Sequence, residues 1–222
     1  MIVTDTLPDA GYAAGVPHPA IGFSIDVPDH WTVLDLNPET WDAWLRAFLD
    51  RRLAGRPNAS RERGPARKAL LDLLLQLHEG KVFMAAILAA EVGGDLVSAS
   101  ATLAWRKLDL GGDEMNLEGL RQVYLRAPAS PGEDMAARRV EGVQLPVGGA
   151  VKVVTREPVT VPGTTRRQSV DMIQYFVPVL ATDWLAVLTA TTGDLPLAAG
   201  VEEVADGMAT SLSLRSGSSG GK

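Results

Sequence analysis

The amino-acid sequence predicts an α+β fold with a single antiparallel β-sheet of about six or seven strands flanked by helices. Residues 82–106 contain two strand-like runs on either side of a glycine turn, which is typical of a β-hairpin. Further extended segments are expected at residues 138–145, 150–157, 168–179 and 184–192. Helical patterns are set between these hairpins and do not follow every strand, which favours α+β layers over repeated βαβ units.

The chain is expected to enter this sheet shortly after residue 20. Apolar residues alternate with small or polar ones over Ile21–Val27, the period of a half-buried strand. Pro28–His30 predicts a turn, and extended chain resumes at Trp31.

Two helices are expected next. Pro38 suits a first helical position behind Asn37 as cap, and an apolar stripe follows at helical spacing. Residues 69–77 predict a second, leucine-rich helix. The segment Arg51–Lys68 between them is expected to be a loop because it contains two glycines and two prolines.

Two more helices are predicted by their apolar spacing, over residues 117–126 behind Asn116 and over residues 198–212. In the second of these, Glu202 and Glu203 lie off the apolar stripe and are expected to face solvent.

The predicted domain organisation is simple. Residues 1–19 are expected to be an irregular arm, residues 20–214 a single α+β domain, and residues 215–222 a flexible polar tail. A chain of 222 residues is within the reach of one core.

Composition narrows the class of function. The chain has no cysteine and a net charge of −6, which fits a reducing compartment and disfavours binding to nucleic acid. The first twenty residues lack the basic and apolar regions of a signal peptide, and no apolar run is long enough for a membrane span. These features predict a cytoplasmic protein.

The sequence holds no recognisable catalytic constellation. Its three histidines, His18, His30 and His78, accompany no nucleophile elbow, and its glycine pairs are not followed by the Lys–Ser or Lys–Thr of a phosphate loop. No acidic segment has the spacing of a calcium loop. We therefore expect no catalytic residue, no metal and no cofactor.

The chain opens with a strand, a turn and a tryptophan, FSIDVPDHW at Phe23–Trp31. It closes with strands over Gln174–Val179 and Trp184–Thr192 and a helix over Ala198–Leu212. Both elements resemble the PsbP-like superfamily, which includes actinobacterial LpqN-type and DcrB-type proteins. The resemblance implies a curved antiparallel sheet with flanking helices.

The sequence departs from the family in two ways. His30 occupies a turn position where glycine is common, and the helices between Asn37 and Glu79 are longer than the usual connection. Relatives are mostly binding, assembly or chaperone-like modules, so the resemblance implies no single activity. LpqN-type relatives are often lipoproteins, but this chain has no cysteine for a lipid anchor.

The helix pair is the predicted partner-binding surface. Its apolar contacts are expected from Trp44, Phe48, Leu71 and Leu75, and its charge from Arg52, Arg56 and Arg63. The partner is expected to be a protein, either acidic or helical. A role as a chaperone or adaptor in bacterial secretion or assembly is the most concrete form of this hypothesis. The opposing interpretations are a solvated loop and ordinary core packing.

Two other classes of function stay open. One is a small-ligand protein or enzyme with a pocket near Asp29, His30 and Trp31. The other is a structural homodimer held through sheet or helix faces.

Overall fold

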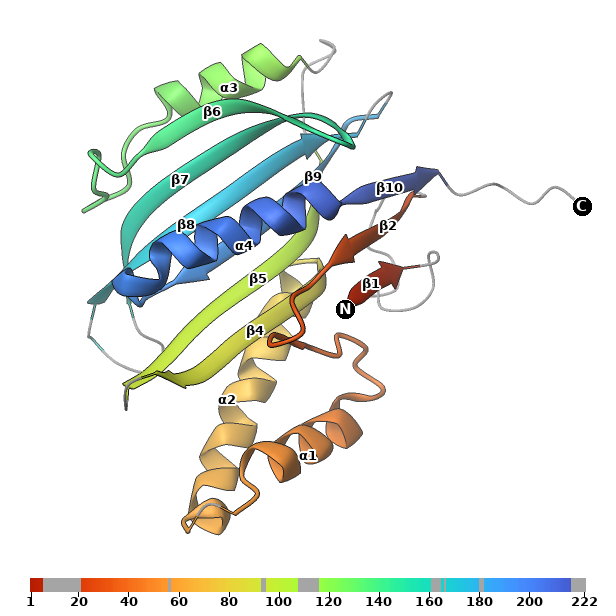
Figure 1. Ribbon diagram of the computed structural model, residues 1–222, viewed down its shortest axis with the longest axis vertical. Helices are drawn as coiled ribbons and strands as arrows, with labels where there is room; N and C mark the ends of the chain where they lie inside the picture. The colour runs from red at the N-terminus through yellow and green to blue at the C-terminus, as the bar shows by residue number, and fades with distance from the viewer. Residues whose placement is uncertain are drawn as a thin grey trace, which may run out of the picture.

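A computed structural model describes residues 1–5, 21–55, 57–92, 95–107, 116–160, 165, 167–179 and 182–216. Its main element is a 7-stranded sheet in which every neighbouring pair is antiparallel (Figure 1). The strand order is β3 (Thr32–Val33), β4 (Val82–Val92), β5 (Asp95–Lys107), β9 (Trp184–Thr192), β8 (Arg167–Pro178), β7 (Gly148–Thr160) and β6 (Arg139–Leu145). The predicted α+β class and the strand number are confirmed.

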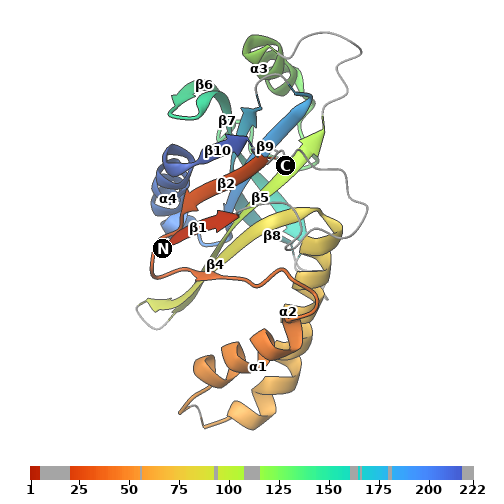
Figure 2. The same cartoon turned by 90° about the vertical axis from the view of Figure 1, so that its right-hand side faces the viewer.

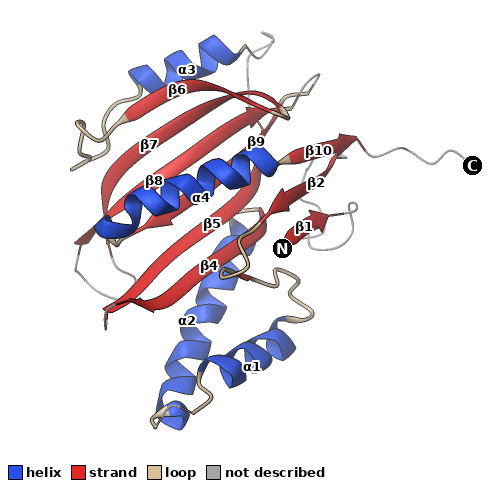
Figure 3. Ribbon diagram, viewed as in Figure 1, coloured by secondary structure: helices blue, strands red, loops and turns tan. Residues whose placement is uncertain are grey.

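Helices cover both faces of this sheet (Figure 3). They are α1 (Trp41–Arg52), α2 (Ala59–Glu79), α3 (Leu117–Arg126) and α4 (Ala198–Ser211), the last preceded by the 3₁₀ turn η1 (Leu195–Leu197). Because side chains alternate along a strand, β7 supplies both layers: Val154 packs in the cluster that contains α4, and Val153 in the cluster that contains α3. Asn116 caps α3 by accepting a hydrogen bond from the Gly119 N–H, as the sequence predicts.

A second sheet of three strands was not expected from the sequence. Its order is β1 (Ile2–Asp5), β2 (Ile21–Asp26) and β10 (Ser213–Ser216). Phe23 and Ile25 of β2 are fully buried in the core cluster to which α4 contributes Met208. This sheet therefore closes the core beside α4.

The irregular arm predicted for residues 1–19 is wrong for residues 2–5, which form β1. A strand of four residues is too short to show a period, and β1 forms because the edge of β2 is available for pairing. Residues 6–20 lie outside the described residues. The tail predicted for 215–222 also starts too early, since β10 extends to Ser216; residues 217–222 are outside the described part.

The helix pair α1–α2 projects from the sheet edge formed by β3 and β4 (Figure 2). Both helices differ from the prediction: α1 begins at Trp41 and not at Pro38, and α2 is longer than predicted because it begins at Ala59, well inside the predicted loop. Pro65 lies within α2, although it removes one helical hydrogen bond. Residues around it are exposed, so the carbonyl that loses its partner can be hydrated, and the prediction of a loop there was wrong.

Candidate functional site

A hollow of about 750 Å³ opens where the two sheets and α1 meet. Its volume is within the range of ordinary ligand pockets. Three segments line it: Met1 with Ile2 and Val3 of β1, the turn and strand residues Asp29, Trp31, Thr32 and Val33, and Phe48, Arg51 and Arg52 at the end of α1. Segments far apart in the sequence thus form one concave surface.

Two buried aromatic side chains line the hollow. Trp31 is 4% exposed, and Phe48 is 8% exposed and stacks on Trp44 with ring centroids 5.0 Å apart. A turn in which the Trp31 N–H donates to the Pro28 carbonyl at 2.9 Å fixes the backbone there. The buried indole N–H of Trp31 has no hydrogen-bond acceptor among the described residues. The site therefore combines rigid apolar surface with one unused donor.

The rim of the hollow is positively charged. Arg51 is exposed and has no partner among the described residues, while Arg52 donates to the neutral carbonyl of Ala89. Asp29 accepts a hydrogen bond from the amino group of Met1 at 2.8 Å, which holds the pKa of this carboxyl below its usual value. Because Asp29 is already paired, the two arginines are free to attract an anion.

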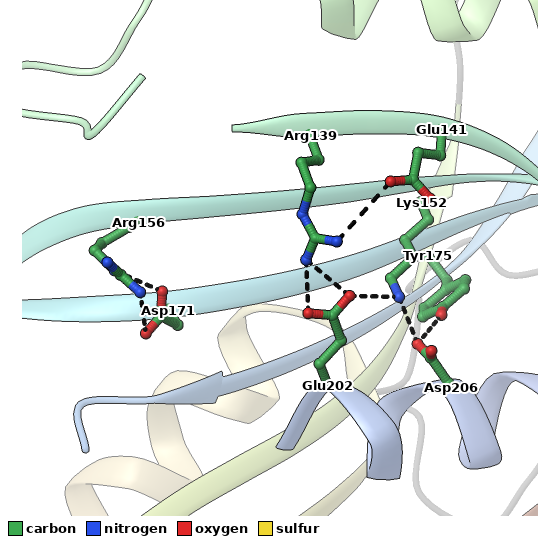
Figure 4. Close-up of polar contacts among 8 residues, drawn as sticks. All are labelled: Arg139, Glu141, Lys152, Arg156, Asp171, Tyr175, Glu202 and Asp206. Atoms are coloured by element: carbon green, nitrogen blue, oxygen red, sulfur yellow. Dashed lines mark hydrogen bonds and ion pairs between the residues drawn. The ribbon is translucent and has the colours of Figure 1, made fainter. Parts of the chain in front are cut away.

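A second polar centre lies between the sheet and α4 (Figure 4). Lys152 of β7 is 7% exposed, and its Nζ lies 2.7 Å from Glu202 Oε1 and 2.7 Å from Asp206 Oδ1. The Tyr175 hydroxyl donates to Asp206, and its ring centroid is 5.6 Å from the Lys152 ammonium. The buried ammonium of Lys152 on β7 thus binds two carboxylates on successive turns of α4, and the hydroxyl of Tyr175 on β8 binds the second of them.

Arginines of β6 and β7 extend this polar centre along the sheet. The whole set of charges is called the charged layer and consists of Arg139, Lys152, Arg156, Asp171, Glu202 and Asp206. Arg139 of β6 reaches Glu202 at 2.6 Å, and Arg156 of β7 pairs with Asp171, directly opposite on β8, at 2.8 Å. A cavity of about 450 Å³ is lined by Arg139 and Arg156 together with Ala198, Ala199 and Glu202 of α4. Every charge named here has an opposite charge within reach, so the layer fits a structural role better than ligand binding.

The charged layer gives the protein a testable pH dependence. Burial would raise the pKa of Glu202, but hydrogen bonds from Lys152 and Arg139 outweigh it and hold the pKa below its ordinary value of 4.5. The folded state therefore favours the ionised carboxylate, and this stabilisation is present above pH 4.5 and lost as the pH falls through the lowered pKa.

We expect Glu202→Gln to make the free energy of unfolding depend less on pH in the acidic range. The unfolding free energy of the parent should fall more steeply below pH 4.5 than that of the variant, as measured by urea titration at several pH values. Glu203→Gln, at the exposed neighbouring position, is the control and should leave the slope unchanged. Equal slopes for the parent and Glu202→Gln would contradict the assignment.

Comparison with known proteins finds little. No family model and no curated protein matches the chain. Among solved structures, the chain is similar to the crystal structure of LpqN, involved in cell envelope biogenesis of Mycobacterium tuberculosis. The two share 10% sequence identity over 97% of this chain and 91% of that chain, with a TM-score of 0.46.

A likeness at this level establishes neither a family nor an activity, and the LpqN-type resemblance stays a prediction. The wider PsbP-like and DcrB-type relationships stay predictions. None of the helices in the described ranges is long and apolar enough to cross a membrane. Within the same ranges, no cluster of three or more His, Asp or Glu side chains could hold a metal ion.

The predicted apolar contacts are only partly available on the surface of the helix pair. Phe48 is buried, and Trp44 and Leu71 are half-buried, packed in the clusters between the two helices. Leu75 is 44% exposed and faces away from these clusters. The four side chains therefore differ in exposure, and Phe48 is the one among them that lines the hollow as described.

The predicted basic patch is also divided. Arg52 lies on the rim of the hollow, whereas Arg63 pairs with Asp50 across the two helices. A second such pair joins Arg67 to Asp42 at 2.6 Å. Arg56 lies outside the described residues. Asp50 and Asp42 of α1 thus pair with two of the arginines of α2, whereas no carboxylate among the described residues pairs with Arg51 or Arg52 at the end of α1.

The alternative pocket shares the same hollow. Asp29 and Trp31 both line it, but His30 does not and its side chain is exposed. The structure therefore joins residues from the two sequence-predicted sites and leaves His30 out.

Sequence patterns do not indicate Met1–Val3 or Val33 as site residues, because their contribution depends on how the two sheets meet. The charged layer was missed as well, and the expectation that Glu202 faces solvent is corrected: it is half-buried and bound by Lys152. A signal was present, since Lys152 interrupts the apolar run Val151–Val154 at a core-facing position.

Proposed function

We propose that this protein is a non-catalytic protein-binding module whose recognition site is the hollow between β1, β3 and α1. The observation that carries the proposal is the combination of an apolar lining, Trp31 and Phe48, with the cation of Arg51, for which the described residues supply no partner. In a protein of net charge −6, this local positive charge favours an acidic partner and raises its rate of association. Rigid aromatic residues are the usual anchors of such contacts.

A more specific form of the proposal is a cytoplasmic chaperone or adaptor in bacterial secretion or assembly. A site of this shape could cover an apolar segment of a partner while the arginines hold neighbouring acidic residues. This role and the cytoplasmic location are supported by the sequence features alone.

A small anionic ligand is the second candidate, because the hollow of about 750 Å³ is large enough for one. Its only carboxylate among the lining residues, Asp29, is held by the amino group of Met1. Without His30 at the hollow, none of the described lining residues supplies a neutral general base. Binding without catalysis is therefore the favoured form of this alternative.

Site-specific photo-crosslinking in the native host tests the proposal. A benzoylphenylalanine at Ile2, which lines the hollow and is 68% exposed, is expected to capture a second protein. The same residue at Val123, which is 63% exposed on α3 beside the opposite sheet edge, is the matched control.

The adduct at Ile2 should be lost when Arg51 and Arg52 are both changed to Glu. An adduct between two copies of this chain would favour the homodimer instead. Identical products at Ile2 and Val123, or no protein adduct at Ile2, would contradict the proposed site.

A further inference from the structure

Two strand edges face the same hollow. Among the described strands, β1 pairs only with β2 and β3 pairs only with β4, so each is the edge of its sheet. Both contribute lining residues: Ile2 and Val3 from β1, and Thr32 and Val33 from β3. The hollow therefore lies between the edges of two different sheets.

The register identifies which backbone groups these edges leave unused. The Met1 amino group donates to the Val27 carbonyl, and the Val27 N–H donates to the Met1 carbonyl, so these two residues form a hydrogen-bonded pair. Such pairs alternate along antiparallel strands, so Val3 also points its N–H and C=O at β2, whereas Ile2 points them away.

The same reasoning applies to β3. The Leu34 N–H donates to the Ala85 carbonyl at 2.9 Å, and Thr32, two residues earlier, is opposite Ile87. The intervening residue, Val33, therefore directs its N–H and C=O away from β4. Ile2 and Val33 thus offer backbone donors and acceptors on the outer edges of their strands, at the hollow.

Both edge strands are short, which by itself limits strand addition, but neither is blocked by a proline or a lysine. The sequences are IVTD for β1 and TV for β3. Ile2 instead exposes an apolar side chain. Unused edge groups of this kind are the basis of β-augmentation, in which a partner segment pairs as an added strand.

We propose that the hollow binds an extended, acidic and apolar segment of a partner protein, which pairs through its backbone with the outer edge of β1 or β3. Apolar side chains of the segment would pack on Trp31 and Phe48, and its carboxylates would reach Arg51 and Arg52. This inference rests on the proposed function and specifies how the partner binds. A helical segment is disfavoured because its backbone groups are satisfied internally and cannot use these edges.

Fluorescence anisotropy with synthetic peptides tests the inference. The probe is a labelled decapeptide that alternates Val and Glu, and it is compared with an alternating Val–Lys peptide and with a peptide of the same Val and Glu content arranged at helical spacing. We expect only the alternating acidic peptide to bind. Arg51→Glu/Arg52→Glu should weaken binding at least about tenfold, since two charge contacts are reversed.

Arg46→Glu/Arg61→Glu changes the net charge by the same amount at two exposed positions outside the hollow, and should leave the affinity unchanged. The backbone is tested by N-methylating alternate amides of the probe in its two possible phases. One phase blocks the groups that face the protein and should lower affinity roughly tenfold, whereas the other phase should have little effect.

The outcomes separate the inference from the proposed function. Equal binding of both N-methylated probes, or tighter binding of the helical arrangement, overturns the strand mode but leaves the crosslink at Ile2 as support for a protein-binding site. Failure of the unmodified probe to bind at millimolar concentration also overturns the strand mode. Absence of a protein crosslink at Ile2 in the parent protein contradicts the proposed function itself.

Discussion

Lys152→Ala is expected to lower the free energy of unfolding by about 3–5 kcal/mol, because it removes the cation from a largely buried set of ion pairs. Lys152 lies 2.7 Å from both Glu202 and Asp206, and its side chain is only 9% exposed. Its removal leaves the carboxylates of Glu202 and Asp206 without their shared cation, and of the two Arg139 binds only Glu202. The loss should be measured by urea or thermal unfolding at neutral pH.

Lys107→Ala is the matched control for this prediction. Lys107 pairs with Asp183 at 3.0 Å, but the two side chains are 62% and 46% exposed, so water screens the pair. Its removal should cost less than about 1 kcal/mol. Comparable losses for the two alanine variants would show that Lys152 is not buried in the way described.

Leu74→Ala is expected to destabilise the protein by about 2–5 kcal/mol. Leu74 is completely buried and is the only buried residue of α2, in a cluster with Leu45, Trp41 and Ala85. Shortening it leaves a cavity at the contact between the helix pair and β4. Unfolding should be followed by tryptophan fluorescence and by circular dichroism.

The adjacent residue provides the control, because Leu75→Ala removes the same atoms from a side chain that is 44% exposed. We expect a change within about 0.5 kcal/mol. If the two leucines proved equally sensitive, α2 would be packed on a different face from the one described. This control also tests whether the fold is stable without the side chain of Leu75, a residue predicted from sequence to bind a partner.

The sequence was most informative where one periodic signal controls one element. The β4–β5 hairpin was predicted within a residue or two, because apolar and polar residues alternate along Leu96–Arg106 and a glycine turn precedes it. Helices α3 and α4 were likewise recognised from their apolar spacing. In these cases local periodicity and tertiary burial agree.

Prediction failed where tertiary context overrides a local signal. Gly64 and Pro65 indicate a loop, yet α2 continues through them, and its cross-helix ion pair from Arg67 to Asp42 lies on the same stretch. The four-residue strand β1 shows no period of its own and exists through its pairing with β2. Such elements are specified by their neighbours and not by their own residues.

The candidate site was recovered in pieces. Phe48 and Arg52 were predicted as one surface, Asp29 and Trp31 as another, and only the fold shows that all four line one hollow. The contact between two sheet edges could not be anticipated, because a second sheet was not expected. Sequence patterns identify apolar and charged residues, but convergence on a site depends on how distant segments pack.

The most direct test of the central claim is residue-specific amide exchange, measured by NMR with and without the alternating Val–Glu peptide. Binding at the strand edges predicts slower exchange and shifted resonances at Ile2 or Val33, whose N–H groups point away from their own sheets, with little change in exchange at Val3 and Thr32, which point inward. Changes confined to exposed positions of α2 such as Leu75, with Ile2 and Val33 unaffected, would contradict the account.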